Sequence, residues 1–236
     1  MNFLLHRHLA ARDLDSAAAG CGAMLPDLWR MNDRRVRPAP VTIDGDHACA
    51  SVLAGIDHHL DRDRWFHRAP LFIDGEKKTA ETFRAAAFNA PRMGLLAHVA
   101  WELCLDGALV RREGVARIVA SVAESFAGAG EAADRAALLH HFDRVDRTAS
   151  ERAAFFRRMR LLEERLVDGA WIAAYSTGPG LAEVISRIRE RLGLDPLGTA
   201  DLDRLASTFG PLLADADVLV DALLSAGIRD APTPVA

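Results

Sequence analysis

The sequence has few cysteines and no long apolar run, and both absences exclude classes of protein. The only cysteines among its 236 residues are Cys21, Cys49 and Cys104, widely spaced and odd in number, which favours a reducing cytoplasm over a disulfide framework. No apolar run approaches the roughly 20 residues of a membrane span. The opening, MNFLLHRHLAARD, has charges inside its apolar stretch and lacks a signal-peptide pattern. We therefore expect a cytoplasmic protein with no membrane partner.

The charge is also unremarkable in sign and size. The chain carries 29 basic and 33 acidic residues, a net charge of −4, which does not favour nucleic acid as a partner. Lysine occurs only as Lys77 and Lys78, so arginine supplies nearly all the positive charge. We attribute this preference for arginine over lysine first to genomic bias and second to the recognition of anions. With 50% hydrophobic residues, the composition is that of a soluble globular protein and argues against disorder.

The sequence predicts an all-α fold. Alanine, leucine, arginine and glutamate are abundant, whereas alternating valine, isoleucine and threonine are rare. Ser150 is the expected N-cap of one helix, and the stretch 30–47, with its prolines and glycine, is the expected mobile loop. Without repeats or a linker, we expect one helical-bundle domain over 1–236, frayed from about 229. The expected helices lie at about 2–11, 47–67, 79–88, 91–109, 114–126, 132–142, 150–166, 181–192 and 200–226.

Histidines and carboxylates gather in the first part of the chain, and one group has the spacing of a metal site. Steps of four residues place His59, Asp63 and His67 on one helical face. Imidazole and carboxylate together suit a divalent metal such as Mn, Fe or Zn. A charged amphipathic helix whose histidines only cap or pair is the structural alternative. A shifted register that uses His58 and Asp61 also fits the spacing.

A second pair, His98 and Glu102, lies within the most apolar predicted helix, LLAHVAWELCL. Burying ionisable groups is costly unless they are paired or bind a metal. The pair therefore predicts either two further metal ligands or a single hydrogen-bonded pair in a core helix. Cys104 beside it is expected in the core, and His140 with His141 at a solvated helix end.

The third group is His6 and His8, followed by Asp27. Residues i and i+2 are about 200° apart on a helix, so only one of the two imidazoles can face a given site. From local sequence alone, Asp27 is better explained as a cap or turn residue.

These groups occur in an order that resembles the acyl carrier protein phosphodiesterase family. That family opens NFLAHLHLA, continues G-N-x-x-x-D and then has a G-I-x-x-H-x-x-x-D helix. A later segment of the chain also resembles the family's Trp-x-x-x-Tyr pattern. The chain departs from the pattern at His67, where the family often has aspartate, and in the helix L-D-x-x-W-D-H-F-L, where His98 and Glu102-Leu103 stand for Asp and Asp-His. The matching residues are His6, His8, Gly22, Asp27, Gly55, Ile56, His59, Asp63, Trp171 and Tyr175.

The resemblance implies a fold like that of the HD-type metal-dependent phosphohydrolases. It implies hydrolysis of the phosphodiester that joins 4′-phosphopantetheine to a serine of acyl carrier protein, a reaction of lipid metabolism, with Mn²⁺ favoured over Fe, Mg or Zn. Asp27 would be a ligand or a water-orienting carboxylate, and His6 a ligand or catalytic imidazole. The expected metal ligands are His6, His8, Asp27, His59, Asp63, His98 and Glu102.

An acidic carrier protein would need a basic surface near the site. The candidates are Arg34, Arg35 and Arg37 after Asp27, and Arg62, Arg64 and Arg68 around the His59 helix. The alternative is that these arginines only solvate a loop and a helix. Two other functions stay open: a metal hydrolase for another phosphoester, such as a nucleotide, and a non-catalytic helical binding protein with a decayed site.

Overall fold

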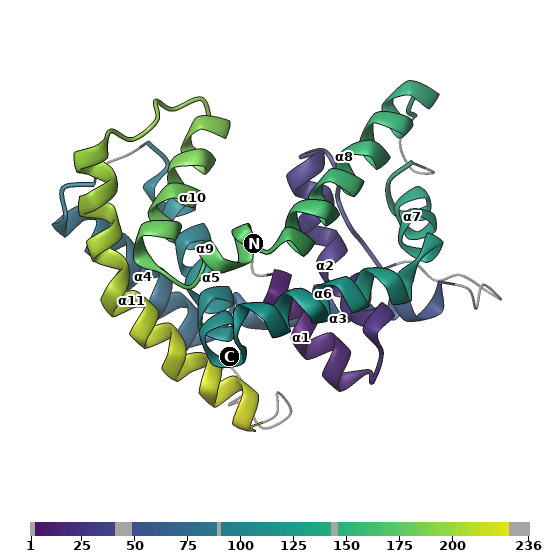
Figure 1. Cartoon of the computed structure of the whole chain (residues 1–236), viewed down its shortest axis with the longest axis horizontal. Helices are drawn as coiled ribbons and strands as arrows, with labels where there is room; N and C mark the ends of the chain where they lie inside the picture. Colours follow the sequence, from purple (N-terminus) through teal and green to yellow (C-terminus); the bar gives the residue numbers. More distant parts are fainter. Residues whose placement is uncertain (1–2, 41–48, 89–90, 143–145, 227–236) are drawn as a thin grey trace. The chain divides into compact units, whose positions relative to one another are not determined.

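The computed structural model describes residues 3–40, 49–88, 91–142 and 146–226, and it confirms the all-α fold class (Figure 1). The described residues contain helices and no strand. The chain divides into two compact units, each built from two segments. The N-terminal unit comprises Asn2–Trp65 and Ala116–Gly169, and the C-terminal unit comprises Phe66–Val115 and Ala170–Ala236 with Met1. That the chain acts as one HD-like domain stays a prediction.

The N-terminal unit surrounds a core in which aromatic side chains pack edge to face. Phe142 and Phe155, for example, lie 5.1 Å apart at their ring centroids. Trp29 and Ile56 are buried in the same core. Its elements are α1 (Phe3–Asp13), α2 (Ala17–Asn32), α3 (Ala50–Phe66), α6 (Val115–Ala129), α7 (Glu131–Ala137), the π-helical turn η1 (Leu138–Phe142) and α8 (Ala149–Asp168).

The C-terminal unit is arranged around α5, which contacts α4, α9, α10 and α11. Its elements are α4 (Pro70–Ala85), α5 (Met93–Glu113), α9 (Ala170–Ala174), α10 (Gly178–Arg191) and α11 (Thr199–Ala226). By length and composition α5 is the one described helix that could cross a membrane, but 72% of its apolar window is buried inside the structure. The core helix of a soluble protein has the same character, and Cys104 on it is buried as predicted.

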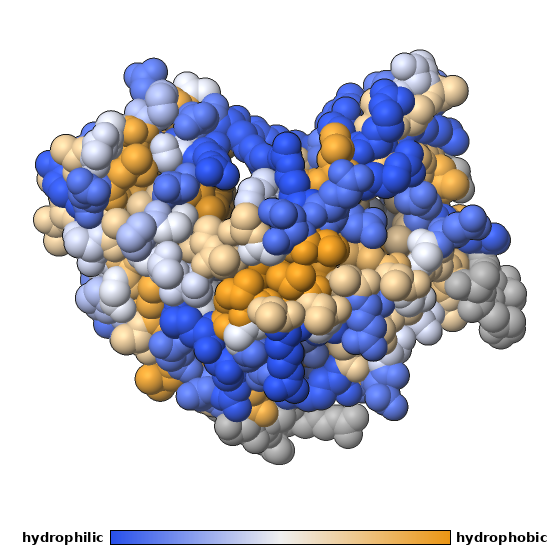
Figure 2. Space-filling view, in the orientation of Figure 1, coloured by the Kyte–Doolittle hydropathy of each residue, from blue (hydrophilic) through white to orange (hydrophobic). Residues whose placement is uncertain are grey.

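On the face drawn in Figure 2, hydrophobic residues gather over α6, while α8 is mostly hydrophilic. Helix α6 buries Ile118 and Val122 on one side and exposes alanines on the other. Its amphipathic pattern is the reason that the sequence predicted it well.

Within the N-terminal unit, α2 and α3 touch through their backbones at two glycines. A Cβ added at Gly22 would lie 2.0 Å from the carbonyl oxygen of Val52. A Cβ added at Gly55 would lie 2.0 Å from the carbonyl oxygen of Ala19. Both distances are far inside van der Waals contact, so only glycine fits at either position. The two glycines therefore fix how closely α2 approaches α3.

Helix α2 was missed by the sequence analysis, which predicted no helix between about residues 11 and 47. Glycines and a proline within 16 residues are poor helix signals. The helix forms because Ser16 caps it, accepting from the amide of Ala19 at 3.2 Å, and because ten of its residues are buried. Tertiary packing here overrides helix propensity.

Three other local predictions need correction. Helix α4 begins at Pro70, not near 79, because proline is well suited to the first helical turn. The N-cap of α8 is Thr148, which forms a capping box with Glu151, and not Ser150. His140 and His141 are buried, not solvated, because they lie in the π-helical turn η1, which packs against the aromatic core.

Some predictions fall outside the described residues. These are the start at His47 of the helix expected over 47–67, part of the expected mobile loop over 30–47, and the frayed tail from about 229. Residues 30–32 of that expected loop belong to α2 instead.

We predict that Gly55→Ala lowers the free energy of unfolding by about 1–3 kcal/mol, because the added methyl must push α3 away from Ala19. Urea denaturation followed by circular dichroism measures this. Gly128→Ala in α6 is the matched control, since its Cβ would meet nothing closer than 3.5 Å. That control should leave stability unchanged or raise it by up to about 1 kcal/mol. Equal stability of the two variants would contradict a close α2–α3 contact.

Candidate metal centres

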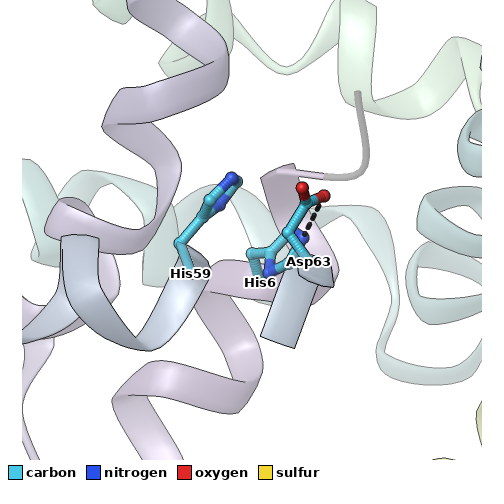
Figure 3. A group of neighbouring side chains, drawn as sticks. All are labelled: His6, His59 and Asp63. Atoms are coloured by element: carbon cyan, nitrogen blue, oxygen red, sulfur yellow. Dashed lines mark ion pairs between the residues drawn. The ribbon is translucent and has the colours of Figure 1, made fainter. Parts of the chain in front are cut away.

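Three side chains of the N-terminal unit converge into a group that can hold a metal ion, which we call the N-terminal centre (Figure 3). His6 comes from α1, and His59 and Asp63 come from one face of α3. One ligand atom from each lies within 4.8 Å of the others. The His6 and His59 rings are 4.0 Å apart at their centroids, and His6 Nε2 is 3.9 Å from Asp63 Oδ1. Both imidazoles are buried, whereas the Asp63 side chain is 42% exposed and opens the centre to solvent.

His59 is held in one tautomer by α2. Its Nδ1 lies 2.8 Å from the carbonyl oxygen of Ala23. A carbonyl can only accept, so Nδ1 carries the proton and donates it, which leaves the Nε2 lone pair available. This backbone contact is the outer-shell orientation that metal-binding histidines usually have.

His6 is suited to act as a neutral ligand. Burial lowers the pKa of its imidazole well below the usual value of 6.5, and the nearby His59 lowers it further. Its Nδ1 is buried and has no hydrogen-bond partner among the described residues. The other ring nitrogen, Nε2, lies 3.9 Å from Asp63 Oδ1, where a neutral imidazole can offer its lone pair to a cation. The donor set therefore fits a divalent metal.

Asp27 and His8 lie outside this group. Asp27 is on α2, partly exposed, one helical turn after Ala23 and so on the same face as the carbonyl that orients His59. His8 is two positions from His6 on α1, and the structure places His6 at the centre, in line with the expectation that only one of them could face it.

A second group lies in the C-terminal unit and contains His98 and Glu102, as well as His67. Glu102 Oε1 is 3.3 Å from His98 Nε2 and 3.6 Å from His67 Nε2. The prediction that His67 continues the His59 and Asp63 face is wrong, because α3 ends at Phe66 and His67 follows in a turn. We call His67, His98 and Glu102 the C-terminal centre.

The alternative register does not form a site. His58 Nε2 is 3.1 Å from Asp13 Oδ2, and Asp61 pairs with Arg64 at 3.1 Å. The Asp61–Arg64 pair lies on the surface of α3, whereas the His58–Asp13 contact joins α3 to α1; both are the structural role that the spacing also allowed.

The predicted basic surface is largely engaged with neighbouring groups. Arg35 pairs with Asp33 through two nitrogens, at 2.9 and 3.0 Å, and Arg37 donates to the carbonyl oxygens of Arg34 and Val36. On α3, Arg62 lies 3.8 Å from Asp13. Arg34 and Arg37 have exposed side chains.

No family model, curated protein or solved structure matches the chain. The likeness to acyl carrier protein phosphodiesterases thus rests on the quoted motifs.

We predict that the metal-free protein loses stability as the pH falls below about 6.5. The folded state binds fewer protons than the unfolded chain, because the pKa of His6 is lowered from 6.5, so acidification favours unfolding. His6 alone contributes about 1.4 kcal/mol per pH unit in this range. Burial also lowers the pKa values of His58, His98 and His141, so these histidines also lower the stability of the folded state as the pH falls.

Urea titrations of the metal-free protein at pH 7.5, 6.5 and 5.5 measure this slope. His6→Gln should flatten it. The same slope in wild type and variant would show that His6 is not buried in its neutral form.

Proposed function

We propose that the chain is a metal-dependent phosphodiester hydrolase whose reaction takes place at the N-terminal centre. The observation that carries this proposal is the convergence of His6, His59 and Asp63 from two helices, with His59 already oriented by a backbone carbonyl. Two imidazoles and a carboxylate form a donor set typical of catalytic metal sites, which keep coordination positions open for water and substrate.

The residues divide into those that bind and those that orient. His6, His59 and Asp63 would hold a divalent cation, with Mn²⁺ as the favoured ion and Fe, Mg or Zn as alternatives. Such a cation polarises phosphoryl oxygens and lowers the pKa of a bound water. His6 fits the ligand role better than the general-acid role, because its lowered pKa disfavours the protonated form. Asp27 is suited to orient a water or to add a ligand, since it follows Ala23 by one turn.

The proposed substrate is the 4′-phosphopantetheine phosphodiester of holo-acyl carrier protein, and the proposed location is the cytoplasm. The resemblance of the opening, the Gly22 to Asp27 segment and the His59 helix supports this choice. The structure adds a physical reason for two residues of that pattern, because Gly22 and Gly55 lie where α2 and α3 touch.

The decisive experiment measures release of 4′-phosphopantetheine from holo-acyl carrier protein with Mn²⁺ and with chelator. We expect metal-dependent hydrolysis that His59→Ala reduces more than about 100-fold, with loss of metal from this centre. His58→Ala is the control, since the neighbouring His58 pairs with Asp13 outside the centre.

Other outcomes distinguish the alternatives. Hydrolysis of bis(4-nitrophenyl) phosphate without release from the carrier protein would favour another phosphoester as substrate. Metal binding without hydrolysis of either compound would favour a non-catalytic binding protein. Full activity of His59→Ala would overturn the proposed centre.

A charge reversal tests whether a carrier protein docks near α2. We predict that the double variant Arg34→Glu, Arg37→Glu slows hydrolysis of holo-acyl carrier protein several-fold at low ionic strength and less at high salt. Hydrolysis of the small phosphodiester should not change. Arg35 is left intact because it pairs with Asp33, which also contacts Arg147. Equal slowing of both substrates would show that the change acts on the fold, not on docking.

A further inference from the structure

At the C-terminal centre, a neutral His98 has too few protons to donate a hydrogen bond at each of its two carboxylate contacts. His98 directs both ring nitrogens at carboxylates: Nδ1 lies 3.2 Å from Glu76 Oε2, and Nε2 lies 3.3 Å from Glu102 Oε1. A neutral imidazole has one N–H, and an ionised carboxylate only accepts. One of these two contacts therefore lacks a proton unless His98 is charged or a cation lies between the groups.

His67 approaches the same carboxylate oxygen. Its Nε2 is 3.6 Å from Glu102 Oε1, and its ring stacks on that of His98 at 4.8 Å with an interplanar angle of 22°. Two imidazole nitrogens and one carboxylate oxygen thus lie within 4.8 Å of one another.

The position of these side chains is fixed by the contact between α4 and α5. A Cβ at Gly75 would lie 2.1 Å from the Trp101 ring, so α4 approaches α5 closely at this glycine. Glu76 follows Gly75, so this approach brings its carboxylate to His98, whereas Glu102 reaches His98 from the next turn of α5. Glu102 is almost buried, with 9% of its side chain exposed, while His67 and His98 are about 28% and 30% exposed.

We propose that His67, His98 and Glu102 bind a divalent transition-metal cation within the C-terminal unit, and that Glu76 is a positioning residue that orients His98. Glu76 accepts the Nδ1 proton of His98 and so directs the Nε2 lone pair at the cation. This site goes beyond the proposed function, which places the reaction at the N-terminal centre.

The donor set favours particular ions. Two nitrogens and one oxygen suit Zn²⁺, Co²⁺ or Fe²⁺, whereas Mg²⁺ and Ca²⁺ prefer oxygen ligands only. The partly exposed imidazoles leave one side open, so water or a small anionic ligand can complete the coordination.

The test is a zinc titration of the metal-free protein by isothermal calorimetry, with elemental analysis after dialysis. We expect two tight Zn²⁺ equivalents in the wild type and one in His98→Ala, with the other equivalent lost in His59→Ala. Glu76→Gln should keep two equivalents but weaken one of them about 10–100-fold. Glu81→Gln, an exposed glutamate on the same helix α4, is the matched control and should bind as the wild type does.

Three results would overturn the proposal: unchanged zinc stoichiometry in His98→Ala, equal affinities of Glu76→Gln and Glu81→Gln, or loss of both equivalents in His59→Ala. Circular dichroism checks that each variant is folded, and Glu76→Gln, which removes no ligand, tests the site even if His98→Ala fails to fold. The readout does not use hydrolysis, so failure of the proposed enzyme activity leaves the result interpretable.

Discussion

Close helix contact at glycine positions is the constraint on which both candidate centres depend. In the N-terminal unit, Gly22 and Gly55 let the backbones of α2 and α3 touch. His59 lies one turn beyond Gly55, and Ala23 follows Gly22, so the same contact aligns the imidazole with its carbonyl acceptor. In the C-terminal unit, Gly75 lets α4 approach Trp101 of α5; Glu102 of the centre follows Trp101, and Glu76, which contacts His98, follows Gly75. A side chain at any of these glycines would separate the helices before it touched a ligand.

The two centres orient their histidines with different acceptors, and the difference has chemical consequences. His59 donates to a neutral backbone carbonyl, whereas His98 donates to the carboxylate of Glu76. A carboxylate acceptor makes the imidazole a more basic ligand than a carbonyl acceptor does. By this effect, His98 is a stronger metal ligand than His59. The N-terminal centre, with buried imidazoles and an exposed Asp63, is instead open to solvent at its carboxylate side.

The sequence predicts pairs along a helix better than contacts between helices. The four-residue spacings of His59 with Asp63 and of His98 with Glu102 place each pair in one group, as the structure has them. Periodicity does not say which helix faces which, so the sequence assigned all these ligands to one site. Glu76 was missed because it precedes the expected start of its helix near 79, and its contact with His98 spans 22 positions. A proline at the first position of α4 was the signal that could have found it.

The donor atoms of the proposed C-terminal centre determine which ion it would favour. His67 and His98 stand where the resembled motifs often have aspartate, so two oxygen donors become nitrogen donors. Nitrogen ligands favour later, softer divalent ions, and affinity for a given set rises from Mn²⁺ towards Zn²⁺ and Cu²⁺. Glu102 retains the single carboxylate that balances part of the cation's charge from an almost buried position. A hard ion such as Mg²⁺ would have to shed water for nitrogen ligands that it binds weakly, so the proposed centre would favour an ion such as Zn²⁺ or Co²⁺ over Mg²⁺.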